Sequence, residues 1–101
     1  MLDRNLYSGL IRLHILHHAA EGPVFGQAMI DELGRHGYRM SAGTLYPILH
    51  GMERLGYLRS RQTMSAGRNR RVYRATPAGR KALVIARRRV QELFGEMFEQ
   101  D

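Results

Sequence analysis

The chain has 101 residues, 44% of them hydrophobic and 25% charged, which is typical of one folded domain and excludes a disordered tail. Its 16 Lys and Arg against 9 Asp and Glu give a formal net charge of +7. This charge favours a polyanionic partner, with nucleic acid and an anionic membrane as the two candidates. No cysteine is present, so disulfides, thiolate metal sites and thiol redox switches are excluded.

The first expected element is a helix over about residues 4–20, which ends at the stop signal Glu21-Gly22-Pro23. Its apolar residues recur at helical spacing on two faces, Leu6, Leu10, Leu13 and Leu16 on one and Tyr7, Ile11 and Ile15 on the other. A helix that is apolar on two sides must be buried on two sides, so another subunit is expected to supply part of the burial. Charged residues and histidines interrupt the segment, which therefore fits neither a signal peptide nor a membrane span, and a cytoplasmic location is expected.

A helix-turn-helix unit is expected next, because two helical segments flank a short turn. The first segment spans roughly Val24 to His36 and is closed by Gly37, and Tyr38-Arg39-Met40 forms the connection. Its inward residues are expected to be Phe25, Met29, Ile30 and Leu33. The second segment is capped by either Ser41 or Thr44.

The second helix of this unit has an apolar and a polar sector. The apolar sector holds Leu45, Ile48, Leu49, Met52 and Leu55, and the opposite sector holds Gly43, Tyr46, Pro47, His50 and Arg54. With Thr44 as cap, Pro47 lies in the first turn and costs little. With Ser41 as cap, the helix is expected to bend near Gly43. Both starts are open at this point.

Two short strands and a last helix complete the chain. The strands are expected over Tyr57 to Gln62 and Arg70 to Ala75, joined by a flexible turn from Thr63 to Asn69. Thr76 is expected to cap the last helix, with Pro77 as its first residue. An apolar seam of about two heptads along this helix indicates a dimer; it consists of Leu83, Ala86, Val90, Leu93 and Met97, with Phe94 and Phe98 beside them.

The distribution of charge singles out the strand region. Between Glu53 and Glu92 there is no acidic residue, while Arg and Lys occur 12 times. Winged-helix proteins bind DNA with a helix that has one polar face and with a basic hairpin that follows this helix. Any single arginine is as readily explained as a solvated surface charge. A solvated surface normally mixes both signs, however, so the cluster as a whole favours an anionic partner.

The candidate DNA-binding residues fall into two groups. Small residues at the start of the third helix allow a close approach to the major groove, and polar side chains on the same face reach bases or phosphates. Hairpin arginines follow a phosphate strand or enter the minor groove, largely without regard to sequence. The full set is Ser41, Ala42, Gly43, Thr44, Tyr46, Pro47, His50, Arg54, Arg68, Asn69, Arg70, Arg71 and Tyr73.

Four motifs together resemble the PadR family of bacterial transcriptional regulators. They are Ser41-Ala42-Gly43-Thr44-Leu45-Tyr46-Pro47-Ile48-Leu49, Glu53-Arg54-Leu55-Gly56-Tyr57-Leu58, Arg70-Arg71-Val72-Tyr73 and Thr76-Pro77-Ala78-Gly79. The fold class expected is mainly α with a small β-hairpin. It is a winged helix-turn-helix domain over residues 1–76, whose first helix also contacts the partner subunit, and a C-terminal dimerisation helix over residues 77–101.

The resemblance implies a homodimer that represses transcription from palindromic operators. It places the dimer contacts on the first and last helices, at Leu6, Leu10, Leu83, Ala86, Val90, Leu93, Phe94 and Met97. Effectors in the short branch of the family include phenolic acids and hydrophobic drugs. The chain departs from the family in reading Phe25-Gly26-Gln27-Ala28-Met29-Ile30 where Tyr-Gly-Tyr-Glu-Ile is frequent, and in having no Trp for a Trp-lined drug pore. The effector class is therefore open.

Histidines on the first helix raise the question of a metal. His14 and His18 are four residues apart on one face, a spacing that can chelate zinc. Interface or partly exposed histidines without metal are the more common arrangement, because two histidines lack the remaining ligands and supporting contacts. No cofactor is expected. The expected partners are double-stranded DNA and a second copy of the chain, and a small hydrophobic effector or a metal ion is left open.

Other function classes fit less of the sequence. A non-specific basic winged-helix module, architectural or for protein interaction, would lack a ligand switch and show steep salt dependence without sequence preference. An enzyme is not expected, because no nucleophile elbow, phosphate-binding glycine loop or paired acid pattern is present. Membrane binding is not expected either, since the basic residues lie on a hairpin and not along one amphipathic helix.

Overall fold

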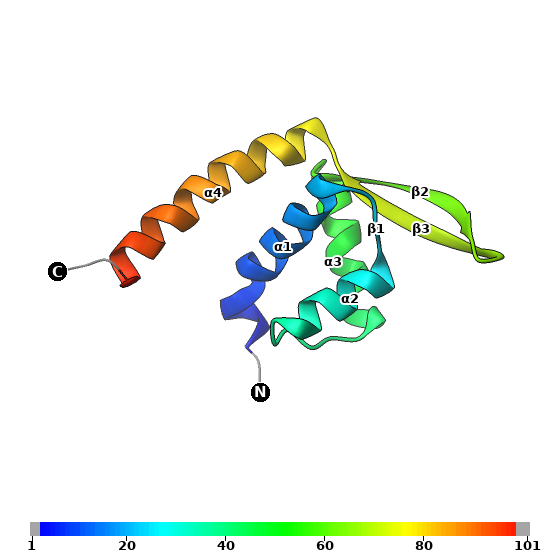
Figure 1. The fold of residues 1–101 in the computed structure, drawn as a ribbon, viewed down its shortest axis with the longest axis horizontal. Coiled ribbons are helices and arrows are strands. Elements are labelled where there is room, and N and C mark those ends of the chain that lie inside the picture. Colours follow the sequence, from blue (N-terminus) through cyan, green and yellow to red (C-terminus); the bar gives the residue numbers. More distant parts are fainter. Residues whose placement is uncertain (1–2, 99–101) are drawn as a thin grey trace.

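The computed structural model describes residues 3–98 and has a mainly helical fold with one small sheet (Figure 1). Its elements in chain order are α1 (Arg4–Glu21), β1 (Val24–Phe25), α2 (Gly26–Arg35), α3 (Ala42–Arg54), β2 (Leu58–Ser65), β3 (Arg68–Ala75) and α4 (Pro77–Phe98). The strands form an antiparallel sheet in the order β1-β3-β2. The expected fold class is thereby confirmed. Residues 1–2 and 99–101, the ends of the two expected domains, lie outside the described residues.

One apolar core forms where α1, α2 and α3 meet the sheet. Ile15, Leu33 and Leu45, one from each helix, are fully buried, and Leu58 of β2 and Tyr73 of β3 belong to the same cluster. Burying an apolar side chain of this size stabilises a fold by about 1.5–3 kcal/mol. The base of the hairpin is therefore anchored firmly to the helices.

Glycines in left-handed conformations end both helices of the helix-turn-helix unit. Gly37 follows α2 with φ +88° and Gly56 follows α3 with φ +87°, a backbone region that residues with a Cβ seldom adopt. In each case the N–H of the next residue bonds to the carbonyl five positions earlier, at 2.9 Å after α2 and 3.0 Å after α3. These bonds satisfy free carbonyls of the last turn and redirect the chain sharply.

Four residues, Gly56, Tyr57, Thr76 and Gly79, join the end of α3 to the start of α4, and we call them the α4 junction. Thr76 donates its N–H to the Tyr57 carbonyl (3.1 Å) and its hydroxyl to the Gly56 carbonyl. Its Oγ1 accepts the N–H of Gly79 (2.9 Å), which confirms Thr76 as the cap of α4. A Cβ on Gly79 would lie 2.2 Å from the Tyr57 carbonyl oxygen, so a larger residue does not fit here.

From the helical core, α4 and the β2–β3 hairpin extend in opposite directions (Figure 1), and the molecule is 56 Å long. The start of α4 packs on α1, close to Leu16, and Gly79 is its one buried residue. Further along, its apolar side chains are exposed, Leu93 by 55%. No helix within residues 3–98 is long and apolar enough to cross a bilayer.

The first correction to the sequence-based expectation concerns Val24 and Phe25. They do not begin the second helix but form β1, opposite Tyr73 and Val72 of β3. Pro23 precedes them and lacks an N–H, and β-branched and aromatic residues favour an extended backbone. The second helix therefore starts only at Gly26.

The second correction concerns the hairpin, whose strands are longer and whose turn is shorter than expected. Ala66 and Gly67 form a two-residue turn with φ of +52° and +75°, and positive φ at both positions is the mark of a type I′ hairpin turn. Ser65 pairs with Arg68 on the opposite strand. Residues 63–65 and 68–69 are thus paired strand residues, not a flexible connection.

The third helix begins after Ser41, which leaves Pro47 inside the helix and resolves the choice of cap against Thr44. Within its predicted apolar sector, Leu45 and Leu49 are buried. Leu55 differs from them. It stands at the C-terminal cap and is 72% exposed.

Replacing Gly79 tests the α4 junction. We expect Gly79→Ala to lower the free energy of unfolding by about 1–3 kcal/mol, measured by urea denaturation, because the methyl group would displace the Tyr57 main chain. Gly34→Ala in α2 is the matched control, since nothing lies within 4 Å of a Cβ at that position. There we expect unchanged or slightly higher stability. Equal stability of the two variants would contradict the tight contact at the junction.

Candidate nucleic-acid interface

The exposed side of α3 carries part of the residue set that the sequence assigned to DNA. Gly43, Pro47, His50 and Arg54 are exposed, whereas Thr44 and Tyr46 are half-buried. Ser41, at the cap position, makes no side-chain hydrogen bond to the helix. Its hydroxyl is therefore available to an external partner. The first turn of α3 is small and open enough for a close approach to a duplex.

The start of α3 and the hairpin border one groove of about 320 Å³. The groove is lined by Ala42 and Tyr46 of α3, by the segment 68–71 of β3, and by Phe25 of β1 with residues from the first half of α2. The two surfaces that the sequence analysis expected to meet DNA are thus neighbours and not on opposite sides of the molecule. Arg68 and Asn69 reach this groove from β3 and not from a turn, which corrects their expected location.

The arginines of the hairpin have no carboxylate partner in the part of the chain that the structure describes. Among residues 3–98, ion pairs of arginine involve Arg35 and Arg89 but none from β2 or β3. The hairpin arginines without such a pair are Arg59, Arg61, Arg68, Arg70, Arg71 and Arg74. Arg59 and Arg74 even stand directly opposite each other across the two strands, and like charges in that position are destabilising. An anionic partner would relieve this repulsion.

Neutral contacts hold two of these arginines in place. The guanidinium carbon of Arg70 lies 4.7 Å from the centre of the Phe25 ring, a cation–π contact. Arg71 donates from Nη1 to Ser60 Oγ at 3.0 Å. Ser60 in turn donates its hydroxyl and its N–H to the Glu53 carboxylate, at 2.8 and 3.1 Å. Glu53 of α3 thereby ties the hairpin to α3 without pairing directly with an arginine.

Tyr73 is the clearest correction to the candidate set. It is fully buried, so it lies in the core and not on a surface that DNA can touch. Its hydroxyl has no hydrogen-bond partner among the described residues, and burial raises the pKa of Tyr73. The aromatic residue in the basic motif therefore anchors the strand that carries the arginines.

Tyr46 packs against the start of α2. A Cβ on Gly26 would lie 2.1 Å from the Tyr46 hydroxyl oxygen, so the absence of a side chain at Gly26 makes room for the ring. Sequence reasoning missed that Phe25, Gly26 and Gln27 line the groove. The signal that could have found them is Val24-Phe25 between Pro23 and Gly26, a short strand bounded by turn residues.

Part of the expected dimer surface is exposed and part is covered. Leu6 and Leu10 on α1 and Val90, Leu93, Phe94 and Met97 on α4 are exposed, while Leu83 and Ala86 are half-buried. Leu83 packs against the core of its own chain. The outer two thirds of α4 therefore present an apolar surface that the described residues do not cover.

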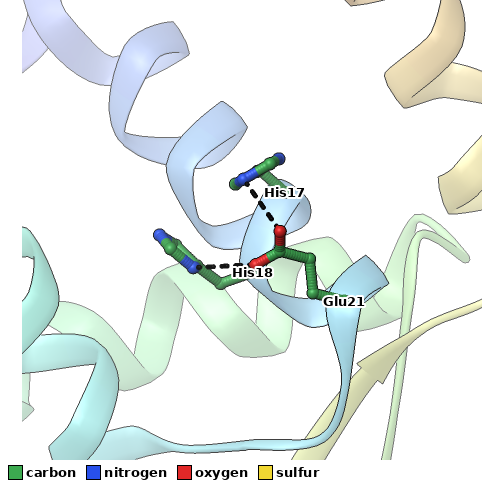
Figure 2. Close-up of side chains that lie close together, drawn as sticks. All are labelled: His17, His18 and Glu21. Carbon is green, nitrogen blue, oxygen red and sulfur yellow. Dashed lines mark ion pairs between the residues drawn. The ribbon is translucent and has the colours of Figure 1, made fainter.

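The histidines lie in a different arrangement from the one expected. His14 stacks on His36 with ring centres 4.6 Å apart, and burial, followed by the charge of His36, lowers the pKa of His14. Among the described residues His14 belongs to no group of three potential metal ligands. His18 instead groups with His17 and Glu21 in the last turn of α1 (Figure 2).

Comparisons with known proteins agree with this architecture. A sequence profile of the Transcriptional regulator PadR-like family matches residues 15–84. The chain is 55% identical over 94 residues to Transcriptional regulator Rv3488 of Mycobacterium tuberculosis, covering 93% of this chain and 88% of that protein.

Solved structures give the same result. A PadR family transcriptional regulator from Eggerthella lenta superposes with a TM-score of 0.77 at 28% identity, covering 96% of this chain and 88% of the other. A PadR-like transcriptional regulator from Bacillus cereus reaches a TM-score of 0.80 at 22% identity over 96% and 99% of the two chains, which shows a shared fold. The chain therefore belongs to the PadR-like family of transcriptional regulators, which confirms the resemblance and implies a non-enzymatic, DNA-binding role.

Proposed function

We propose that this regulator is a dimeric repressor that binds a palindromic DNA operator and responds to a small effector. One observation carries the DNA-binding part of the proposal: the start of α3 lines the same groove as Arg68, Arg70 and Arg71 of β3. In this arrangement α3 reads base edges in the major groove. The hairpin holds the adjacent phosphates and sets the register of α3 on the duplex.

The exposed apolar side chains of α4 support the dimer. Four of them, Val90, Leu93, Met97 and Phe98, are each at least 46% exposed on a helix that extends away from its own core. A second copy related by a twofold axis would cover this surface and place two α3 helices symmetrically. A twofold protein in turn matches a palindromic site with half-sites about one helical turn apart.

The exposed apolar residues of α1 support the effector response. Dimerisation through α1 and α4 would bring the exposed Leu6 and Leu10 near the apolar side chains of α4. An apolar site between subunits is a suitable place for a small hydrophobic ligand. A ligand there would act on DNA binding by changing the spacing of the two α3 helices, which needs differential affinity for the two spacings.

The decisive experiment is footprinting of the purified protein on the DNA upstream of its own coding sequence, followed by competition with random DNA. We expect a protected palindrome and a preference of at least about 10³-fold over random sequence at one salt concentration. Equal affinity for both DNAs, with steep salt dependence alone, would instead support the non-specific module.

Arg71 tests the contribution of the hairpin. We expect Arg71→Ala to weaken binding to operator and random DNA alike and to make the slope of log K against log salt shallower by about 0.9, as for one lost phosphate contact. Arg89→Ala is the matched control, because Arg89 lies on α4 and pairs with Glu92. An unchanged slope for Arg71→Ala would remove this residue from the phosphate contacts.

Thr44 and His50 test the contribution of α3. We expect substitution of either residue to change which bases are preferred, by about 1–3 kcal/mol at the affected position, because side chains on this face reach base edges. Selection of operators from a random DNA library measures this change. A preference identical to that of the unmodified protein would assign both residues to the phosphate backbone or to solvent.

Leu93 tests the dimer. We expect Leu93→Asp to shift the protein to monomers in sedimentation equilibrium, because an unpaired carboxylate would be buried between two copies of α4. Leu55→Asp is the control, since Leu55 is equally an exposed leucine but lies at the end of α3. An undiminished dimer for Leu93→Asp would place the interface elsewhere.

A further inference from the structure

The last turn of α1 gathers three potential metal ligands around one point. His17 Nε2 lies 3.5 Å from one Glu21 carboxylate oxygen, and His18 Nδ1 lies 3.7 Å from the other. All three ligand atoms are within 4.8 Å of one another. Figure 2 shows both imidazoles turned toward the same carboxylate. Spacing in the helix explains this, because positions three and four residues before Glu21 flank its side chain.

We propose that His17, His18 and Glu21 form a binding site for a divalent transition-metal ion such as Zn²⁺. Two imidazole nitrogens and one carboxylate oxygen are ligands that Zn²⁺ binds in proteins at about 2.0–2.2 Å. Ligand atoms at that distance from one ion are separated by roughly 3–4 Å, which is close to the separations already present before any ion enters. Only small rotations of the side chains are needed to close the site.

A second carboxylate supports His18 from its other side. His18 Nε2 lies 3.4 Å from Glu32 Oε2 on α2. An imidazole whose Nε2–H faces a carboxylate presents the lone pair of Nδ1 on the opposite side, which here is the side of Glu21. This carboxylate–histidine arrangement is the usual support of metal-binding histidines and raises their basicity.

Glu32 is well suited to this supporting role because its carboxylate is held in place by two neighbours. It accepts a hydrogen bond from Arg35 and lies 2.8 Å from His36 Nε2. The Glu32 side chain is also only 21% exposed and lies between α1 and α2. The position of Glu32 beside His18 is therefore fixed by the surrounding structure.

The open side of the site faces solvent. The side chains of His17 and Glu21 are 54% and 65% exposed, whereas that of His18 is 27% exposed. Three protein ligands leave at least one coordination position for water or for a group from another molecule. Binding would connect the last turn of α1 to α2 through Glu32, immediately before the chain turns into β1.

The test is titration of the full-length chain, without a polyhistidine tag, with Zn²⁺ in a calorimeter and with Co²⁺ followed by its visible absorption. We expect one ion per chain. His17→Ala, His18→Ala and Glu21→Gln should each lower the affinity by about 100-fold or more, and Glu32→Gln should lower it by about 10–100-fold, because it removes only the supporting carboxylate. Zn²⁺ should also raise the melting temperature of the unmodified chain, and not that of His17→Ala.

Two control variants distinguish this site from metal binding elsewhere on the chain. His14→Ala removes a histidine from the same helix, and Glu92→Gln removes an exposed carboxylate from α4; both should bind Zn²⁺ as the unmodified chain does. Undiminished binding in His17→Ala and Glu21→Gln, or no binding by the unmodified chain at all, would overturn the proposal. Because His17 and Glu21 are largely exposed, their variants are expected to fold, which circular dichroism verifies. The measurement uses no DNA, so its outcome is independent of the repressor proposal.

Discussion

The whole arrangement depends on the close contact between Gly79 and the Tyr57 main chain at the α4 junction. This contact fixes the point at which the last helix leaves the core, immediately beside the point at which β2 begins. Thr76 closes the junction with bonds to both Gly56 and Gly79. The basic hairpin and the apolar α4 both leave the core at this junction. They extend from it to opposite sides of α1–α3 (Figure 1). The structure thereby separates a basic surface on the hairpin from an apolar surface on α4.

Much of the fold could be predicted because the relevant signals are local. Gly37, Gly56 and the pair Thr76-Pro77 mark helix boundaries through backbone geometry alone. Apolar residues at helical spacing predicted the core helices. The short β1 escaped prediction because its local signal, Val24-Phe25 between Pro23 and Gly26, spans only two residues. Its pairing with Tyr73 and Val72 joins segments about fifty residues apart, as the register with β3 shows.

The candidate site was predictable in outline and not in detail. The absence of acidic residues between Glu53 and Glu92 identified the basic surface from the sequence alone. What the sequence did not reveal is which residues within a motif point inward. Tyr73 lies among arginines but is buried. Gly26 lies outside the four motifs that carry the resemblance, but it makes room for the ring of Tyr46. Both facts depend on how the sheet packs on the helices, which is a property of the assembled fold.

The two-residue turn at Ala66 and Gly67 has a consequence for how the hairpin meets a curved partner. β1 pairs with β3 only at Val72 and Tyr73, so beyond these residues the hairpin is a two-stranded ribbon. An isolated ribbon of this kind is marginally stable in water and opens before the core does. The guanidinium groups near its tip are thus carried on the less stable part of the sheet. If the hairpin contacts DNA as proposed, it would adapt to the local width of a groove, and the entropy lost on ordering it would reduce the affinity.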